Sequence, residues 1–99
     1  MLNILIVDDE VLERTALTKI INNSSEDVLV IGEAPNGRMA IEMAQEHRPD
    51  IIFMDIKMPG IDGVQAVKAI KKIDPSIRFI MVSAFNTFEY AKEVMQQGG

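Results

Sequence analysis

Three aspartates stand where two apolar stretches of the sequence end. Asp8 and Asp9 follow the largely apolar run Leu2–Val7, and Asp55 follows residues 51–54. Because ligands of an open parallel sheet bind at the carboxyl ends of its strands, we expect the three carboxylates to share that edge. Carboxylates held together are costly unless a cation offsets their charge, and Mg²⁺ prefers such oxygen ligands. The pattern therefore predicts a magnesium site beside one special aspartate.

The rest of the chain alternates apolar runs with amphipathic stretches, which position those acids. Strands are predicted at Leu2–Val7, residues 28–31, residues 51–54 and Arg78–Val82. Helices are predicted over residues 11–21, between Asn36-Gly37 and Pro49, over residues 64–70 before Asp74-Pro75, and from Asn86 to the glycines at 98–99. Strict alternation of strand and helix predicts an α/β domain, with a parallel sheet covered by helices on both faces.

Composition narrows the class of protein further. The 99 residues suffice for one domain, and the absence of cysteine excludes disulfides, thiolate catalysis and zinc–thiolate sites. Residues 1–50 carry ten acids against four bases, a balance that argues against direct binding of nucleic acid. Since neither a membrane-spanning apolar stretch nor a basic-then-apolar leader is present, we expect a cytoplasmic protein without membrane contact.

Four motifs at the predicted strand ends form a pattern together. They are ILIVDDE at residues 4–10, Asp55, MPGIDG at residues 58–63 and VSA at residues 82–84. In order and spacing these motifs resemble the receiver domain of bacterial two-component response regulators. Residues 83–91 further resemble the subgroup whose output domain is an AraC-type DNA binder. The resemblance implies a flavodoxin-like doubly wound sheet with strand order 2-1-3-4, in which the first and third strands are neighbours.

The resemblance also implies roles for the acids. Asp55 is expected to take a phosphoryl group from a phosphohistidine on a sensor histidine kinase, forming an acyl phosphate. Asp9 and Asp55 are expected to ligate Mg²⁺ directly, together with the backbone carbonyl of Lys57, while Asp8 acts through water. Such a domain is a signalling phosphoacceptor rather than an enzyme in the ordinary sense.

The segment after the fourth strand is expected to carry the switch. By resemblance, Ser83 donates its hydroxyl to a phosphoryl oxygen, and the small Ala84 leaves the phosphoryl group room to enter. The same hydroxyl could instead cap a helix. If Ser83 acts as the resemblance implies, phosphorylation draws the loop inward and controls a DNA-binding output domain in the parent protein.

Other functions fit the same architecture less well. A hydrolase of the haloacid dehalogenase type needs a second aspartate two positions after its nucleophile, where this chain has Lys57. A flavin-binding electron carrier needs a neutral phosphate loop after the first strand, where Asp8, Asp9 and Glu10 would repel a phosphate. Glu10 itself is explained more simply as an acidic residue that complements the dipole at the start of a helix. The basic cluster of Lys68, Lys71 and Lys72 is expected to be a solvated helix face.

The alternative that stays open is a receiver-like interaction module that never turns over. Complete receivers continue into a fifth strand with a lysine and a fifth helix, and residues 1–99 are expected to form a receiver that stops before both. The lysine normally pairs with the phosphoryl group, so its absence favours this alternative. The bare edge of the fourth strand would also favour self-association.

Overall fold

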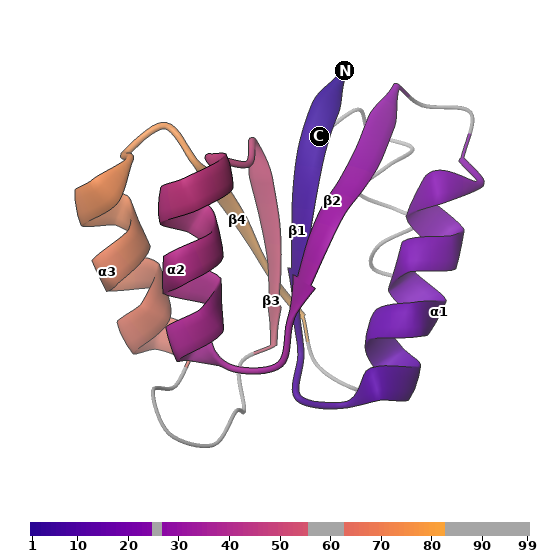
Figure 1. Cartoon of the computed structure of the whole chain (residues 1–99), viewed down its shortest axis with the longest axis horizontal. Coiled ribbons are helices and arrows are strands. Elements are labelled where there is room, and N and C mark those ends of the chain that lie inside the picture. Colours follow the sequence, from indigo (N-terminus) through magenta and orange to yellow (C-terminus); the bar gives the residue numbers. More distant parts are fainter. Residues whose placement is uncertain (25–26, 56–62, 83–99) are drawn as a thin grey trace.

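The computed structural model describes residues 1–24, 27–55 and 63–82, and the predicted glycine loop and fourth helix lie outside these ranges. Within these ranges, seven elements follow one another (Figure 1). They are β1 (Leu2–Val7), α1 (Val11–Asn22), β2 (Val28–Ala34), α2 (Gly37–His47), β3 (Ile51–Asp55), α3 (Gly63–Ile73) and β4 (Arg78–Val82). The predicted alternation of strand and helix is confirmed over this part of the chain.

The four strands of the described residues form one parallel sheet in the order β2-β1-β3-β4, which is the order that the resemblance to receiver domains implied. β1 lies in the middle and pairs with β3, so that Val7 stands opposite Met54. β4 pairs with β3 and is the outer strand of the described sheet. The order places the carboxyl ends of β1 and β3 side by side, where a parallel sheet binds its ligands.

Helices cover both faces of the sheet, with α1 on one side and α2 and α3 together on the other (Figure 1). Because successive side chains of a strand point to opposite faces, β1 contributes to two cores. Its residues Ile4 and Ile6 pack with Leu17 and Ile21 of α1. Its residues Leu5 and Val7 pack instead with side chains of the other two helices, namely Ala40, Ala44, Ala66 and Ile70. Burial on both faces explains the nearly unbroken apolar runs of the central strands.

β2 is longer than the sequence predicted, because it continues through Gly32 and Glu33 to Ala34. Glycine and glutamate are poor strand formers, so the apolar pattern ended three residues early. The register of the β1–β2 pair shifts between Ile4 and Leu5, which accommodates one extra residue of β2. The extension matters because it brings Ala34 opposite Val7, directly beside the acidic residues that follow β1.

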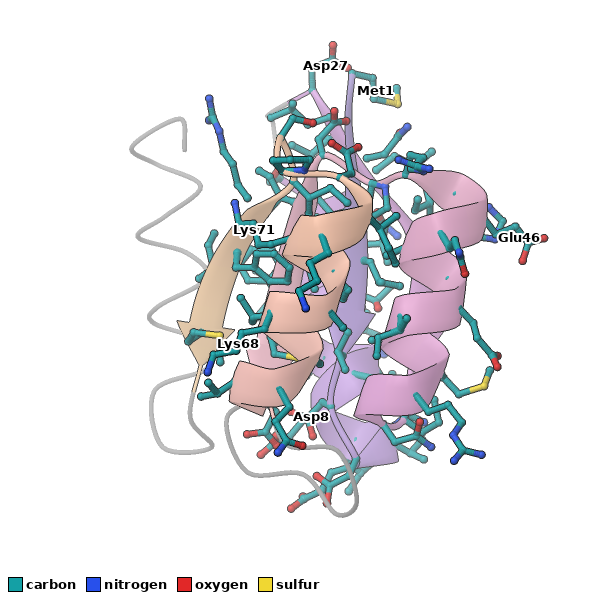
Figure 2. All side chains as sticks on the ribbon, turned by 90° about the vertical axis from the view of Figure 1, so that its left-hand side faces the viewer. Met1, Asp8, Asp27, Glu46, Lys68 and Lys71 are labelled. Carbon is teal, nitrogen blue, oxygen red and sulfur yellow. The ribbon has the colours of Figure 1, made fainter. Side chains whose placement is uncertain are left out.

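The basic cluster of α3 differs from the prediction at one position. Lys71 is not simply solvated, since its Nζ donates to the carbonyl oxygens of Ile77 at 2.7 Å and Pro75 at 3.3 Å. The same Nζ lies 5.6 Å from the ring centroid of Phe79 on β4, and Figure 2 shows Lys71 and Lys68 on α3. Lys71 therefore ties the end of α3 to the turn before β4. No helix in residues 1–24, 27–55 and 63–82 is long and apolar enough to cross a membrane.

Candidate metal centre

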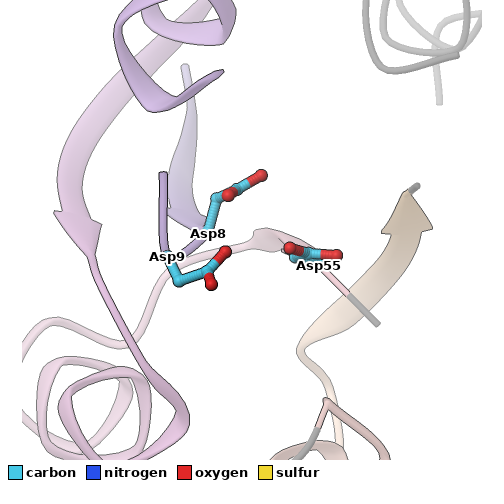
Figure 3. A group of neighbouring side chains, drawn as sticks. All are labelled: Asp8, Asp9 and Asp55. Carbon is cyan, nitrogen blue, oxygen red and sulfur yellow. The ribbon is translucent and has the colours of Figure 1, made fainter. Parts of the chain in front are cut away.

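The three aspartates that the sequence singled out come together at the carboxyl edge of the sheet. One carboxylate oxygen from each of Asp8, Asp9 and Asp55 lies within 4.8 Å of the others, and Figure 3 shows the three side chains. The strand register explains the meeting: because Val7 pairs with Met54, the next residues, Asp8 and Asp55, lie beside each other at the carboxyl ends of the two strands. Asp9 follows in the turn between β1 and α1.

Burial differs among the three side chains. Asp8 is 1% exposed, Asp55 is 9% exposed, and Asp9 is open to solvent. The group is therefore shielded from solvent at Asp8 and accessible to solvent at Asp9. A ligand or a reacting group from solution can approach it from the open side.

The turn after β1 holds Asp8 firmly by its backbone and by one carboxylate oxygen. Its main-chain nitrogen donates to the carbonyl oxygen of Ala34 at 3.0 Å, which uses the extension of β2. Its Oδ1 accepts from the main-chain nitrogen of Glu10 at 2.9 Å, an arrangement typical of a turn that starts a helix. Its Oδ2 is buried and has no hydrogen-bond partner in the part of the chain that the structure describes.

Burial raises the pKa of Asp8 to about 7, and the neighbouring carboxylates of Glu13 and Asp9 act in the same direction. A buried carboxylate oxygen without a partner is unfavourable unless a proton or a cation compensates it. Carboxylate oxygens are also the donors that hard divalent cations prefer. The orphaned Oδ2 of Asp8 and the three gathered acids therefore fit Mg²⁺.

Three residues that the sequence analysis did not single out support this turn: Arg14, Glu33 and Thr18. Arg14 of α1 donates from Nη1 to the carbonyl oxygen of Asp8 at 2.6 Å, and its Nε lies 3.3 Å from Oε1 of Glu33 on β2. Thr18 donates to the other carboxylate oxygen of Glu33 at 3.3 Å. The only sequence signal for Arg14 was its position: it is a basic residue in the first turns of the helix that follows Asp8 and Asp9. Glu33 gave no such signal, because its meeting with Arg14 depends on the longer β2.

Other predicted site residues lie outside the described ranges. Lys57 belongs to residues 56–62, and Ser83 and Ala84 belong to residues 83–99. The structure thus brings together three of the predicted side chains, Asp8, Asp9 and Asp55.

Two apolar side chains at the start of α1 are exposed to solvent. Val11 and Leu12, the first two residues of α1, are 63% and 82% exposed. Both follow closely after Asp9 in the chain, so the acidic group lies beside an apolar helix start.

Comparison with known protein sequences gives a consistent result. The family model described as "Response regulator receiver domain" matches residues 4–99. The chain is 41% identical over 98 residues to the transcriptional regulatory protein YesN of Bacillus subtilis, covering 99% of this chain and 27% of YesN. It is 42% identical over 95 residues to the chemotaxis protein CheY of Thermotoga maritima, covering 96% of this chain and 78% of CheY. The chain thus spans about a quarter of the length of YesN and most of CheY.

Solved structures resemble the fold closely. The response regulator domain of Thermotoga maritima CheB has a TM-score of 0.87 at 30% identity, with 98% of this chain and 92% of that chain covered. A two-component transcriptional regulator AraC from Clostridium phytofermentans has a TM-score of 0.81 at 33% identity, with 98% and 88% covered. A chain of the CheX–CheY–BeF3–Mg²⁺ complex from Borrelia burgdorferi has a TM-score of 0.77 at 34% identity, with 98% and 72% covered.

Proposed function

Because this chain belongs to the response regulator receiver family, we propose that it is a phosphoacceptor whose Asp55 takes a phosphoryl group from a sensor histidine kinase. The observation that carries the proposal is the meeting of Asp8, Asp9 and Asp55 at the carboxyl ends of β1 and β3. Receiver domains are signalling modules, so the reaction serves to switch the protein rather than to convert a substrate.

Asp55 is the best placed of the three acids to act as nucleophile. It ends β3, a strand buried throughout, which fixes the direction of its carboxylate. Unlike Asp8, which is 1% exposed, Asp55 keeps 9% of its surface exposed to solvent. Asp9 is open as well, but it lies in a turn and not at the end of a strand. A rigid nucleophile with an open approach favours in-line attack.

The transfer itself requires little covalent chemistry from the protein. A carboxylate oxygen of Asp55 attacks the phosphorus of a phosphohistidine, and the new P–O bond forms as the P–N bond breaks. The departing imidazole nitrogen keeps the electron pair of the broken bond and takes up a proton. The kinase loses the phosphoryl group and this chain gains an acyl phosphate.

The acids around Asp55 would hold the metal ion that such a transfer needs. We assign Asp9 and Asp55 as direct ligands, with the backbone carbonyl of Lys57 as a third and Asp8 acting through water. A bound Mg²⁺ would offset the negative charge on the phosphoryl oxygens as they enter an acidic site. The orphaned Oδ2 of Asp8 supports this assignment, because it leaves one buried acceptor for the metal shell.

Signalling beyond the site belongs to the same proposal. Ser83 would bond a phosphoryl oxygen, Ala84 would leave it room, and the loop would move to change the contacts of an output domain. The likeness to YesN and to an AraC-type regulator supports a DNA-binding output domain and control of transcription in the parent protein. The exposed Val11 and Leu12 offer the kinase an apolar contact beside the acids. We expect the protein to act in the cytoplasm.

One experiment tests the proposal directly. The purified chain is incubated with Mg²⁺ and acetyl phosphate and its intact mass is measured. We expect one added phosphoryl group, lost on the Asp55→Asn variant and retained on the Glu10→Gln variant. Label that persists in Asp55→Asn contradicts the assignment of the nucleophile. No label on the unmodified chain, with Mg²⁺ bound, contradicts the phosphoacceptor function and leaves an interaction module.

A further inference from the structure

The guanidinium of Arg14 joins three segments of the chain at the acidic turn. Its Nη1 donates to the carbonyl oxygen of Asp8 at 2.6 Å, and its Nε pairs with Glu33 at 3.3 Å. Arg14 belongs to α1, Asp8 to the turn after β1, and Glu33 to the extended part of β2. One planar side chain therefore fixes the turn against a helix and a strand at once.

The carbonyl that Arg14 holds has a special place in the candidate metal centre. It belongs to the peptide group that links Asp8 to Asp9, so its direction follows ψ of Asp8 and φ of Asp9. Rotation of this peptide would turn the two side chains relative to each other. A hydrogen bond to this carbonyl thus limits how far the two carboxylates can move apart.

Glu33 stabilises the position of the Arg14 side chain. The side chain of Arg14 is only 13% exposed, and a cation so sheltered needs an anion nearby. Glu33 supplies that charge and is held in turn by Thr18. Glu33 also precedes Ala34, whose carbonyl oxygen receives the main-chain nitrogen of Asp8. Both backbone groups of Asp8 are therefore fixed through the same end of β2.

We propose that Arg14, oriented by Glu33, is a positioning residue that holds Asp8 and Asp9 in the geometry that binds Mg²⁺. The inference rests on the proposed function, because it concerns the metal ligands assigned there. Arg14 is proposed as a ligand of neither the metal nor the phosphoryl group. It acts through the Asp8–Asp9 peptide, as residues behind a metal ligand commonly do.

If Arg14 acts only through its charge, its loss should change the Mg²⁺ affinity in the opposite direction from that expected if it positions the ligands. As a positive charge close to an acidic site, Arg14 repels an incoming cation, so its removal would tighten Mg²⁺ binding. As a positioning residue, its removal frees the Asp8–Asp9 peptide and weakens Mg²⁺ binding. As a purely structural residue, it would change the stability of the fold and leave the affinity of the folded protein unchanged.

The test is a calorimetric Mg²⁺ titration of the full chain and three variants, at a temperature where each is folded. Arg14→Met removes the charge and the hydrogen bonds, and Arg14→Lys keeps the charge but loses the planar fork. Lys19→Met is the matched control, since it removes one exposed positive charge from the same helix. We expect binding weaker by about tenfold in Arg14→Met, an intermediate loss in Arg14→Lys, and no loss in Lys19→Met.

Several outcomes would overturn the inference. Equal or tighter binding in Arg14→Met leaves only a charge effect, and weakening of equal size in Lys19→Met points to the net charge of the helix. A parallel urea titration without metal separates stability from affinity, because a merely structural Arg14 lowers the former alone. An amide NMR spectrum without metal adds a second readout, in which the Asp9 signal should shift or broaden in Arg14→Met. An unmodified chain that binds no Mg²⁺ contradicts the proposed function itself.

Discussion

Asp8 and Asp55 each lie one residue beyond the Val7–Met54 pair of two neighbouring parallel strands, and this register places their carboxylates in one group with Asp9. The meeting depends on strand pairing between residues far apart in the sequence. A shift of β3 by one residue would turn Asp55 toward the opposite face of the sheet, because side chains alternate along a strand. The register is therefore as necessary to the site as the acids themselves.

Asp9→Asn should weaken Mg²⁺ binding by about tenfold or more, a loss of at least about 1.4 kcal/mol, because it removes a charged oxygen ligand from the group. Glu10→Gln is the matched control. Glu10 is the N-cap residue of α1 and its side chain makes no capping hydrogen bond, while its main-chain contact to Asp8 survives the change. Calorimetric titration measures both variants. Equal losses in the two variants would contradict the ligand assignment.

The stability of the metal-free protein should fall as the pH rises from about 4 to about 7. Burial raises the pKa of Asp8 from 3.8 to about 7, so the folded chain holds a proton that the unfolded chain has already lost. That contribution is fully present below the unfolded pKa and disappears as the pH passes the folded pKa. Urea unfolding in the presence of a chelator measures the trend, which Asp8→Asn should flatten.

Asp74 provides the control for this pH dependence. Hydrogen bonds from Ser76 lower the pKa of Asp74, so its contribution is lost only as the pH falls through the acidic range. Asp74→Asn should therefore leave the slope between about pH 5 and pH 7 as it is in the unmodified chain. If the slope persists in Asp8→Asn and disappears in Asp74→Asn, the pH dependence arises from Asp74 and the prediction for Asp8 is wrong.

Lys71→Met should destabilise the fold by about 1–2 kcal/mol, because it removes charged hydrogen bonds to the turn before β4 while it keeps the apolar stem. Lys68→Met is the control on the same helix. Lys68 is exposed, and substitutions at such positions usually change stability by about 0.5 kcal/mol or less. Urea unfolding decides between them. Equal effects would mean that the contacts of Lys71 contribute nothing beyond its charge.

Asn36→Ala should cost about 1 kcal/mol, because Oδ1 of Asn36 accepts the main-chain hydrogen bond of Met39 and caps α2. Asn36→Asp keeps an acceptor oxygen at the same place and should restore most of the loss. Thermal unfolding of the two variants gives the comparison. An equally large loss in Asn36→Asp would show that the amide nitrogen, rather than the capping oxygen, stabilises this helix start.

Sequence reasoning recovers most of this architecture because its strongest signals are local. The runs of β1 and β4 and the start of α1 match the predicted residues, since apolar periodicity fixes them. The end of β2 was not predicted, because Gly32 and Glu33 do not favour strands. Pairing with β1 holds both residues in the strand. Tertiary pairing overrides local preference at such positions.

The candidate site divides in the same way. Asp8, Asp9 and Asp55 could be predicted because each ends an apolar run at one edge of the sheet. The contact of Arg14 with Glu33 could not, since it joins a helix to a strand end that the apolar pattern excluded. The bonds of Lys71 likewise depend on how the chain turns after α3, which charge spacing alone does not specify.

Oδ2 of Asp8, which has no hydrogen-bond partner among the described residues, has a practical consequence for handling the protein. A ligand that binds only the folded state stabilises it in proportion to the logarithm of its concentration once that exceeds the dissociation constant. With a divalent cation as that ligand, melting temperatures compared between buffers will differ whenever free magnesium differs. If Mg²⁺ is that ligand, thermal-shift screens on this domain require a fixed magnesium concentration, and a chelator present in one well would mimic a destabilising compound.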